Sequence, residues 1–297
     1  ETATITNTLI HSNGEEGIRL RFNYDLVLNN CTITKNISHG LDLTEGGRPT
    51  IRNTILSDNL GKEIYIRNSG SQVVDVDYSV IQGGNENGIY FEGSNGLVTY
   101  GTNNISNTDA LFSDLDNNDF TLGQYSKAIG AGSNSFALLK DIQGSPRPNP
   151  SGSNSDIGAY ESSLGTPIPK PTLVTVNQNG SGLFSSIEDA ISFASDGDTV
   201  IVEAGIYYEN IEIMDKDIHL ASLYLTSGDT SYISSTIIDG SQHFPLKSTV
   251  TIGSSISQSV NNVKLTGLTI TGGGFTNTNV SYGAGIRARY LQSLECN

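Results

Sequence analysis

A repeat of about 23 residues is the feature of this sequence that most constrains its fold. One set of aliphatic residues is spaced by 23, 23 and 25 positions and consists of Ile5, Leu28, Ile51 and Val76. A second set with the same spacing consists of Ile18, Leu41, Ile64 and Ile89. Since several positions advance together, each unit is predicted to be one turn of a repetitive structure.

Within each unit, apolar residues stand two positions apart in short segments, with Thr, Asn, Asp or Arg between them. This alternation places the apolar side chains on one face of a strand and the polar ones on the other. Only 16% of residues are charged and 7% are aromatic, while 33 are glycine, which favours turn-rich β structure over helical bundles. The sequence therefore predicts an all-β solenoid with several strands per coil.

Asparagine recurs at two positions of the repeat. The first column is Asn7, Asn30 and Asn53, and the second is Asn13, Asn36 and Asn59. Asparagine tolerates the left-handed backbone of a tight corner, and its amide can both donate and accept hydrogen bonds. We expect the first column to form an amide ladder between coils and the second to mark another corner. Both are interpreted as structural.

These aliphatic and asparagine columns, over residues 3–91, resemble those of the right-handed parallel β-helix proteins, the pectin-lyase-like group. A second resemblance lies in residues 109–161. Its blocks Asp109–Phe112, Ser126–Gly130, Asp141–Pro148 and Asp156–Glu161 are similar to the carboxy-terminal signature of secreted bacterial β-helix repeat proteins. The resemblance implies a bacterial protein that is secreted or on the cell surface. We expect the signature to cover the exposed edge of the last coil.

Residues 162–172 (SSLGTPIPKPT) hold three prolines and predict a linker between a first unit, 1–161, and a second unit, 173–297. The sequence carries no signal peptide, and we expect it to be a fragment of a larger exported protein. Of the two cysteines, Cys31 is expected to be a buried free thiol.

In the second unit, Ser186 and Asp189 are placed as a capping box at the start of a short amphipathic helix near 186–195. The order of a Gly-Ser-Gly turn, this helix and the later segment Gly205–Glu209 resembles the amino-terminal cap of pectinesterase-like β-helices. The resemblance implies the cap and first coils of a second β-helix. Residues 287–297 depart from the coil pattern.

Four outward positions of one strand column form the candidate ligand site: Arg19, Asp42, Tyr65 and Tyr90. In one hypothesis the two tyrosines stack on sugar rings, and Arg19 and Asp42 bond hydroxyls or uronates. In the other, the column is an ordinary solvated sheet face whose aromatic pair stabilises the strands.

A calcium site is a minor hypothesis for the turn that contains Asp114, Asp116, Asn118 and Asp119. Residues with side-chain oxygens alternate in this turn, as at the start of a calcium-binding loop. However, Asp119 occupies the position that needs glycine, and Tyr125 the position that needs glutamate. A polar turn is therefore favoured, and no other cofactor is expected.

The net charge of −15 would repel nucleic acid, and no stretch reaches the roughly 18 apolar residues of a membrane span. We expect neither nucleic acid binding nor membrane insertion, and a polysaccharide or cell-surface glycan as partner. The predicted function is a non-catalytic extracellular or cell-surface scaffold, adhesin-like or polysaccharide-binding. The alternative is a polysaccharide lyase or pectinesterase-like esterase whose catalytic coils are divergent or missing. No catalytic residue is assigned.

Overall fold

The computed structural model describes residues 2–21, 25–44, 48–67, 72–93, 96–106, 112–115, 117–242, 247–253, 261–274, 285–289 and 291–297. The chain divides into two compact units, Glu1–Pro169 and Lys170–Asn297, and each is described by itself. The division falls within the proline-rich segment that was predicted as a linker.

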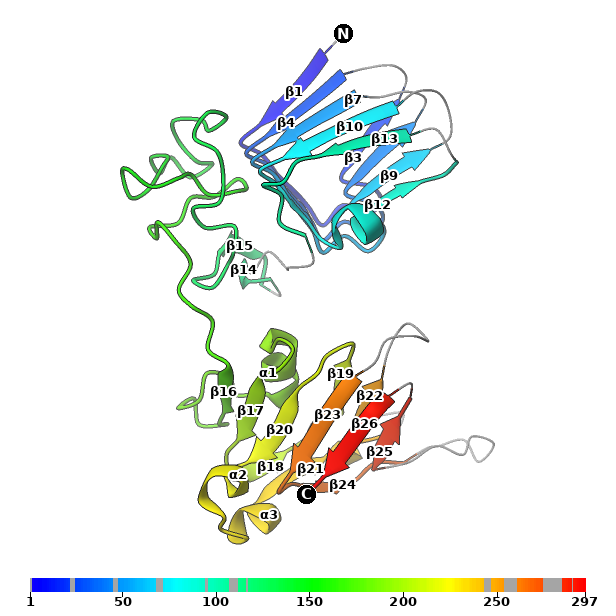
Figure 1. The fold of residues 1–297 in the computed structure, drawn as a ribbon, viewed down its shortest axis with the longest axis vertical. Coiled ribbons are helices and arrows are strands. Elements are labelled where there is room, and N and C mark those ends of the chain that lie inside the picture. The colour runs from blue at the N-terminus through cyan, green and yellow to red at the C-terminus, as the bar shows by residue number, and fades with distance from the viewer. Residues whose placement is uncertain are drawn as a thin grey trace. The chain divides into compact units, whose positions relative to one another are not determined.

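Three parallel sheets surround an apolar interior in the first unit (Figure 1). The first sheet contains β1 (Thr2–Thr6), β4 (Asp25–Asn29), β7 (Arg48–Arg52), β10 (Gln72–Asp77) and β13 (Gly96–Tyr100). The second contains β2 (Leu9–His11), β5 (Thr32–Thr34), β8 (Ile55–Ser57) and β11 (Val80–Ile81). The third contains β3 (Ile18–Arg21), β6 (Leu41–Thr44), β9 (Ile64–Arg67) and β12 (Ile89–Phe91). Each strand pairs with the equivalent strand of the next coil, which makes the unit a parallel β-helix.

The strand register reproduces the sequence repeat. Leu28 pairs with Ile5 on one side and Ile51 on the other, and both Leu28 and Ile51 are fully buried. The column that starts at Ile18 lines the same apolar core from the third sheet. Cys31 is a buried free thiol, as predicted.

Two columns of left-handed residues turn the chain between sheets. Asn7, Asn30, Asn53 and Tyr78 have φ of 52°, 52°, 46° and 49°, which confirms the first predicted corner. At the second corner the left-handed residues are Ser12, Lys35 and Asp58, with φ of 55°, 52° and 57°. They directly precede Asn13, Asn36 and Asn59. In the fourth coil a short helical turn, η1 (Gly84–Gly88), follows β11 at this level.

A closing segment, which we define as residues 126–161, follows the antiparallel hairpin of β14 (Phe112–Asp114) and β15 (Asp119–Leu122). We expected it to cover the edge of the last coil. Instead its Ala128 and Ile157 pack on Ile55 and Val80, the apolar outward residues of the second sheet. It also reaches back to the second coil, where the Ala159 N–H donates to Thr32 Oγ1 at 3.0 Å. The closing segment therefore covers the apolar outward face of the second sheet rather than the edge of the last coil, because the burial of these apolar residues is favourable.

The second unit also has three parallel sheets (Figure 1). The first contains β16 (Leu173–Val176), β17 (Thr199–Val202), β20 (His219–Ser222), β23 (Asn261–Thr266) and β26 (Leu291–Cys296). The second contains β18 (Gly205–Tyr207), β21 (Thr236–Asp239) and β24 (Thr269–Thr271), and the third β19 (Ile211–Met214), β22 (Val250–Gly253) and β25 (Ile286–Ala288). Although residues 287–297 depart from the coil pattern in sequence, β26 extends the first sheet through a register shift at Asn261 and Asn262.

Helix α1 (Ile187–Phe193) confirms the helix predicted near 186–195, and Ser186 Oγ accepts the Asp189 N–H at 3.3 Å. Its buried face packs into the core of the second unit. The carboxylate of Glu209 accepts the N–H groups of Ile187 and Glu188 at 3.0 and 2.9 Å, so this motif residue stabilises the helix start. Three single turns were not predicted: α2 (Tyr224–Ser227), α3 (Ser231–Ser235) and η2 (Gly240–Gln242).

Candidate functional site

The four candidate ligand residues lie side by side on the outward face of the third sheet of the first unit. Arg19 on β3 pairs with Asp42 on β6, which pairs with Tyr65 on β9, which pairs with Tyr90 on β12. Since paired residues on parallel strands are about 5 Å apart, the sequence column is also a column in space.

Asp42 is fully buried beneath two guanidinium groups. Arg19 Nε donates to its Oδ2 at 3.1 Å, and Arg67 Nε donates to both of its oxygens at 3.0 Å. A second carboxylate, Glu16, contacts Arg19 and lies 3.8 Å from Arg67. The pKa of Arg19 is raised chiefly by its hydrogen bond to Glu16, and that of Arg67 by its hydrogen bond to Asp42. Arg19 and Asp42 therefore bind each other within a cluster of two cations and two anions.

Sequence reasoning missed Arg67 and Glu16. The available signal for Arg67 was its position two residues after Tyr65, which puts it on the same outward face of β9. Glu16 precedes β3 in the turn of the first coil, three residues before Arg19. Each residue contacts Asp42 or its partners, so the outward face is more fully paired than the sequence indicated.

The tyrosines form one aromatic stack with His39. The His39 and Tyr65 rings have centroids 4.2 Å apart at 18°, and Tyr65 and Tyr90 have centroids 5.3 Å apart at 27°. Tyr65 thus lies between two rings, with the Arg67 guanidinium 5.2 Å from its centroid. Tyr90 ends the stack on the edge strand β12 and is 46% exposed. It is the more exposed tyrosine of the pair.

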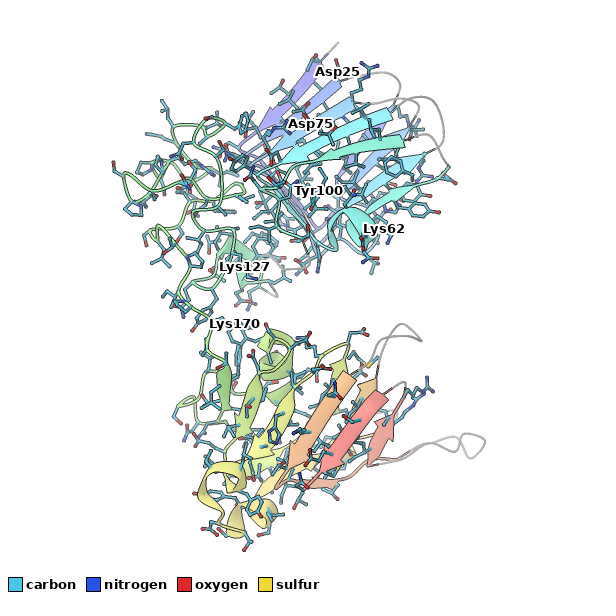
Figure 2. All side chains as sticks on the ribbon, viewed as in Figure 1. Asp25, Lys62, Asp75, Tyr100, Lys127 and Lys170 are labelled. Carbon is cyan, nitrogen blue, oxygen red and sulfur yellow. The ribbon has the colours of Figure 1, made fainter. Side chains whose placement is uncertain are left out.

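An open groove lies beside the stack, lined by His39, Leu60, Gly61, Lys62, Tyr65 and Tyr90. Leu60 is 80% exposed at its rim. Lys62, labelled in Figure 2 beside η1, donates from Nζ to the Asn87 carbonyl at 2.8 Å. His39 Nδ1 accepts the Lys62 N–H at 2.8 Å, and burial lowers the pKa of the imidazole. An aromatic face beside an apolar rim is a surface suited to the C–H face of a sugar ring.

Residues 1–129 match the family described as the right-handed β-helix region. The first unit is a right-handed β-helix. Its parallel sheets and coil register agree with that family. No curated protein and no solved structure matches the chain.

The asparagine ladder of this β-helix is in the second column. Asn13 Nδ2 donates to Asn36 Oδ1, and Asn36 Nδ2 donates to Asn59 Oδ1, both at 2.8 Å. The same two oxygens also accept the backbone N–H of Asn13 and Asn36 at 3.1 Å. The ladder does not continue into the next coil, which has Gly84 at the position of the asparagine. At this end of the ladder, the buried side chain of Glu63 accepts hydrogen bonds from Asn59 instead.

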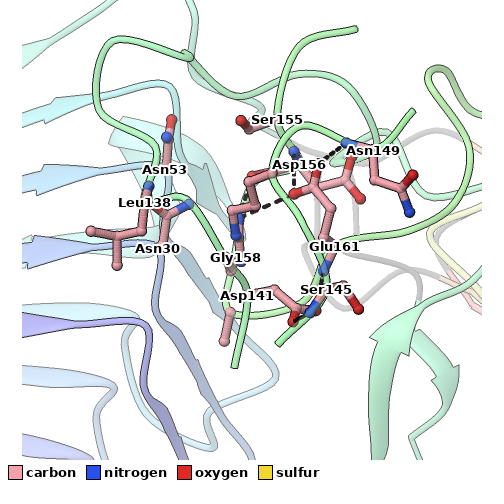
Figure 3. Close-up of polar contacts among 12 residues, drawn as sticks. Asn30, Asn53, Leu138, Asp141, Ser145, Asn149, Ser155, Asp156, Gly158 and Glu161 are labelled. Carbon is pink, nitrogen blue, oxygen red and sulfur yellow. Dashed lines mark hydrogen bonds and ion pairs between the residues drawn. The ribbon is translucent and has the colours of Figure 1, made fainter. Parts of the chain in front are cut away.

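The prediction of an amide ladder in the first column was wrong. Asn53 exchanges two hydrogen bonds of 2.9 Å with the backbone of Ser133, and Asn30 Oδ1 accepts the Leu138 N–H at 3.3 Å. Among the described contacts, Asn7 Oδ1 is buried without a hydrogen-bond partner. The amides of Asn30 and Asn53, which are themselves left-handed corner residues, point toward the closing segment rather than along the column (Figure 3).

Replacing Asn36 by alanine is expected to destabilise the first unit by about 1 to 3 kcal/mol, because the buried Asn59 amide and the exposed Asn13 amide each lose their ladder partner. The measurement is the free energy of unfolding from urea titration. Asn85→Ala, at an exposed asparagine of η1 outside the ladder, serves as the comparison. Equal stability of Asn36→Ala and the unmodified protein would contradict the ladder's role.

The calcium candidate is a tight turn between β14 and β15. Asp114 accepts hydrogen bonds from the Asn117 N–H and amide, and Asp119 accepts from Thr121. Asn118 Oδ1 accepts from the Lys35 ammonium at 3.3 Å. Asp116 lies outside the described residues. Within the described part, no group of three or more acidic, histidine or cysteine side chains gathers as a metal site. Calcium binding stays a prediction.

The closing segment is held together by a buried charge cluster (Figure 3). Arg147 lies 3.3 Å from Glu161, both side chains being fully buried, and donates to the carbonyls of Asp156 and Gly158 at 3.2 and 2.8 Å. Asp141 accepts the Glu161 N–H at 3.0 Å. Burial lowers the pKa of Arg147, and raises those of Asp156 to about 7 and of Glu161. Two blocks of the sequence signature, Asp141–Pro148 and Asp156–Glu161, thus meet in one structural cluster.

Proposed function

We propose that the first unit is a non-catalytic glycan-binding scaffold, presented outside a bacterial cell or on its surface. One observation carries this proposal: the aromatic stack of His39, Tyr65 and Tyr90 ends in a half-exposed ring beside an open groove. Sugar rings bind proteins by placing a C–H face on an aromatic ring. A parallel β-helix also presents a rigid, extended face over which a polymer can lie.

The chemistry of the cluster supports binding rather than catalysis. A general base or nucleophile needs a carboxylate that can reach the substrate. Asp42 is the carboxylate of this column, and it is fully buried and bonded to Arg19 and Arg67.

No described helix is long and apolar enough to cross a membrane.

Replacing Tyr90 by alanine is expected to weaken glycan binding about tenfold or more, which corresponds to about 1.4 kcal/mol lost from the stacked ring. The measurement is calorimetric titration of the full chain with soluble oligosaccharides. Tyr208→Ala is the matched control, because Tyr208 is an exposed tyrosine of the second unit. Unchanged affinity in Tyr90→Ala would refute the proposed site.

The same samples separate a scaffold from the alternative enzyme. A polysaccharide lyase or esterase would release unsaturated uronates or methanol during the titration, and a scaffold would leave the glycan intact. Turnover that survives in the Tyr90→Ala variant would place an activity elsewhere in the chain.

A further inference from the structure

The charges around the groove are already matched within the protein. The guanidinium groups of Arg19 and Arg67, on the same sheet as the stacked tyrosines, face the carboxylates of Asp42 and Glu16. The single Nε–H of Arg67 is shared between the two carboxylate oxygens of Asp42. Since Asp42 is fully buried, withdrawing either arginine toward a ligand would leave that carboxylate without its partner, which is costly.

The remaining basic groups add little positive charge. His39 accepts a backbone N–H at Nδ1, and burial lowers the pKa of its ring, so it is a neutral imidazole at pH 7. Lys62 is the one ammonium among the lining residues, and it is bonded to the Asn87 carbonyl. Glu92, the residue after β12, adds a negative charge near the stack, since burial first and then Glu92 raise the pKa of the Tyr65 phenol.

We propose that this groove takes a neutral glycan, rather than a uronate or sulfated one, with the C–H face of a pyranose ring on Tyr90. Recognition of an anionic sugar requires unpaired guanidinium or ammonium groups, and here the arginines are bound to carboxylates. The chain's net charge of −15 opposes a polyanion at long range as well. A neutral sugar needs the aromatic face and hydroxyl partners, such as the Nε2–H that the hydrogen bonding of His39 leaves on its ring. This inference rests on the proposed glycan-binding function.

The test is calorimetric titration of the full chain with neutral gluco-, manno- and galacto-oligosaccharides. A matched pair is added that differs only in charge: an oligogalacturonate and its full methyl ester. Each titration is run at low and at high ionic strength. We expect a neutral probe to bind with an affinity that changes less than twofold with salt. The free oligogalacturonate should bind at least tenfold more weakly than its ester.

Three variants sharpen the result. Lys127→Ala, at an exposed lysine that does not line the groove, is expected to leave neutral binding within twofold, and Tyr90→Ala to weaken it about tenfold. Tighter binding of the free uronate, lost both in high salt and in Lys62→Ala, would overturn the neutral specificity while keeping the glycan site. Absence of binding by every probe would overturn the glycan-binding function itself.

Discussion

Replacing Arg147 by alanine is expected to destabilise the first unit by about 3 to 5 kcal/mol, which is among the largest single effects in this protein. The substitution leaves Glu161 as a buried carboxylate without its counter-ion, and it removes two donors from the carbonyls of Asp156 and Gly158. A buried charge that loses its partner costs far more than an exposed pair contributes. The effect should appear as a lower midpoint of urea unfolding.

Arg48→Ala provides the matched control, because Arg48 is an exposed arginine on β7 of the same unit. Its loss is expected to change the free energy of unfolding by less than about 0.5 kcal/mol. The double variant Arg147→Met with Glu161→Leu should recover part of the stability, since an apolar pair leaves no unpaired charge. If Arg147→Ala unfolds at the same urea concentration as Arg48→Ala, the cluster does not hold the closing segment.

The fold could be predicted because the sequence repeat and the apolar core both follow from the need for an apolar side chain in every coil. Leu28 and Ile51 recur in register because each coil must place an apolar residue at that level of the interior. The spacing of these residues therefore predicted the parallel coils. The resemblance to right-handed parallel β-helix proteins agrees with the family match found for residues 1–129. In the second unit, the capping box of Ser186 and Asp189 is a local signal that correctly predicted α1.

The ladder could not be assigned from spacing alone, because both asparagine columns have the same period. The difference is a one-residue offset in which residue adopts the left-handed backbone. At the first corner Asn30 itself has φ of 52°, whereas at the second corner Lys35 does, just before Asn36. Because of this offset, the Asn30 amide points outward, whereas the Asn36 amide points along its column. The sequence pattern contains no signal of the offset.

Contacts between distant segments were also beyond the sequence. Asp42 is neutralised by Arg67, which is 25 residues away, and Asn53 is bonded to Ser133, which is 80 residues away. Charge pairing across coils depends on side-chain direction, and docking of the closing segment depends on the apolar flank at Ile55 and Val80. The strand pairing aligns the four candidate residues in one column, and the ion pairs of Arg19 and Arg67 with Asp42 are what the sequence did not indicate.

The variant Glu63→Gln is expected to remove a loss of stability that the unmodified protein shows as pH rises. Burial is the main cause that raises the pKa of Glu63 from 4.5 to about 8, against the hydrogen bonds from Asn59 that lower it. The folded state thus binds this proton more tightly than the unfolded state. The resulting stabilisation is fully present below about pH 4.5 and is lost as pH rises through about 8. Above that, the carboxylate is charged and buried at the end of the ladder.

A tenfold change in proton affinity corresponds to about 1.4 kcal/mol, so the full effect is roughly 3 to 5 kcal/mol between pH 4.5 and 9. The measurement is the free energy of unfolding of both proteins across this range, and the difference between them isolates Glu63 from other buried acids such as Asp156, whose pKa is raised to about 7. Glutamine keeps an oxygen that accepts from Asn59 but carries no charge. The exposed Glu15→Gln is the control and should follow the unmodified protein at every pH. If Glu63→Gln follows it as well, Glu63 is not the buried proton-binding end of the ladder.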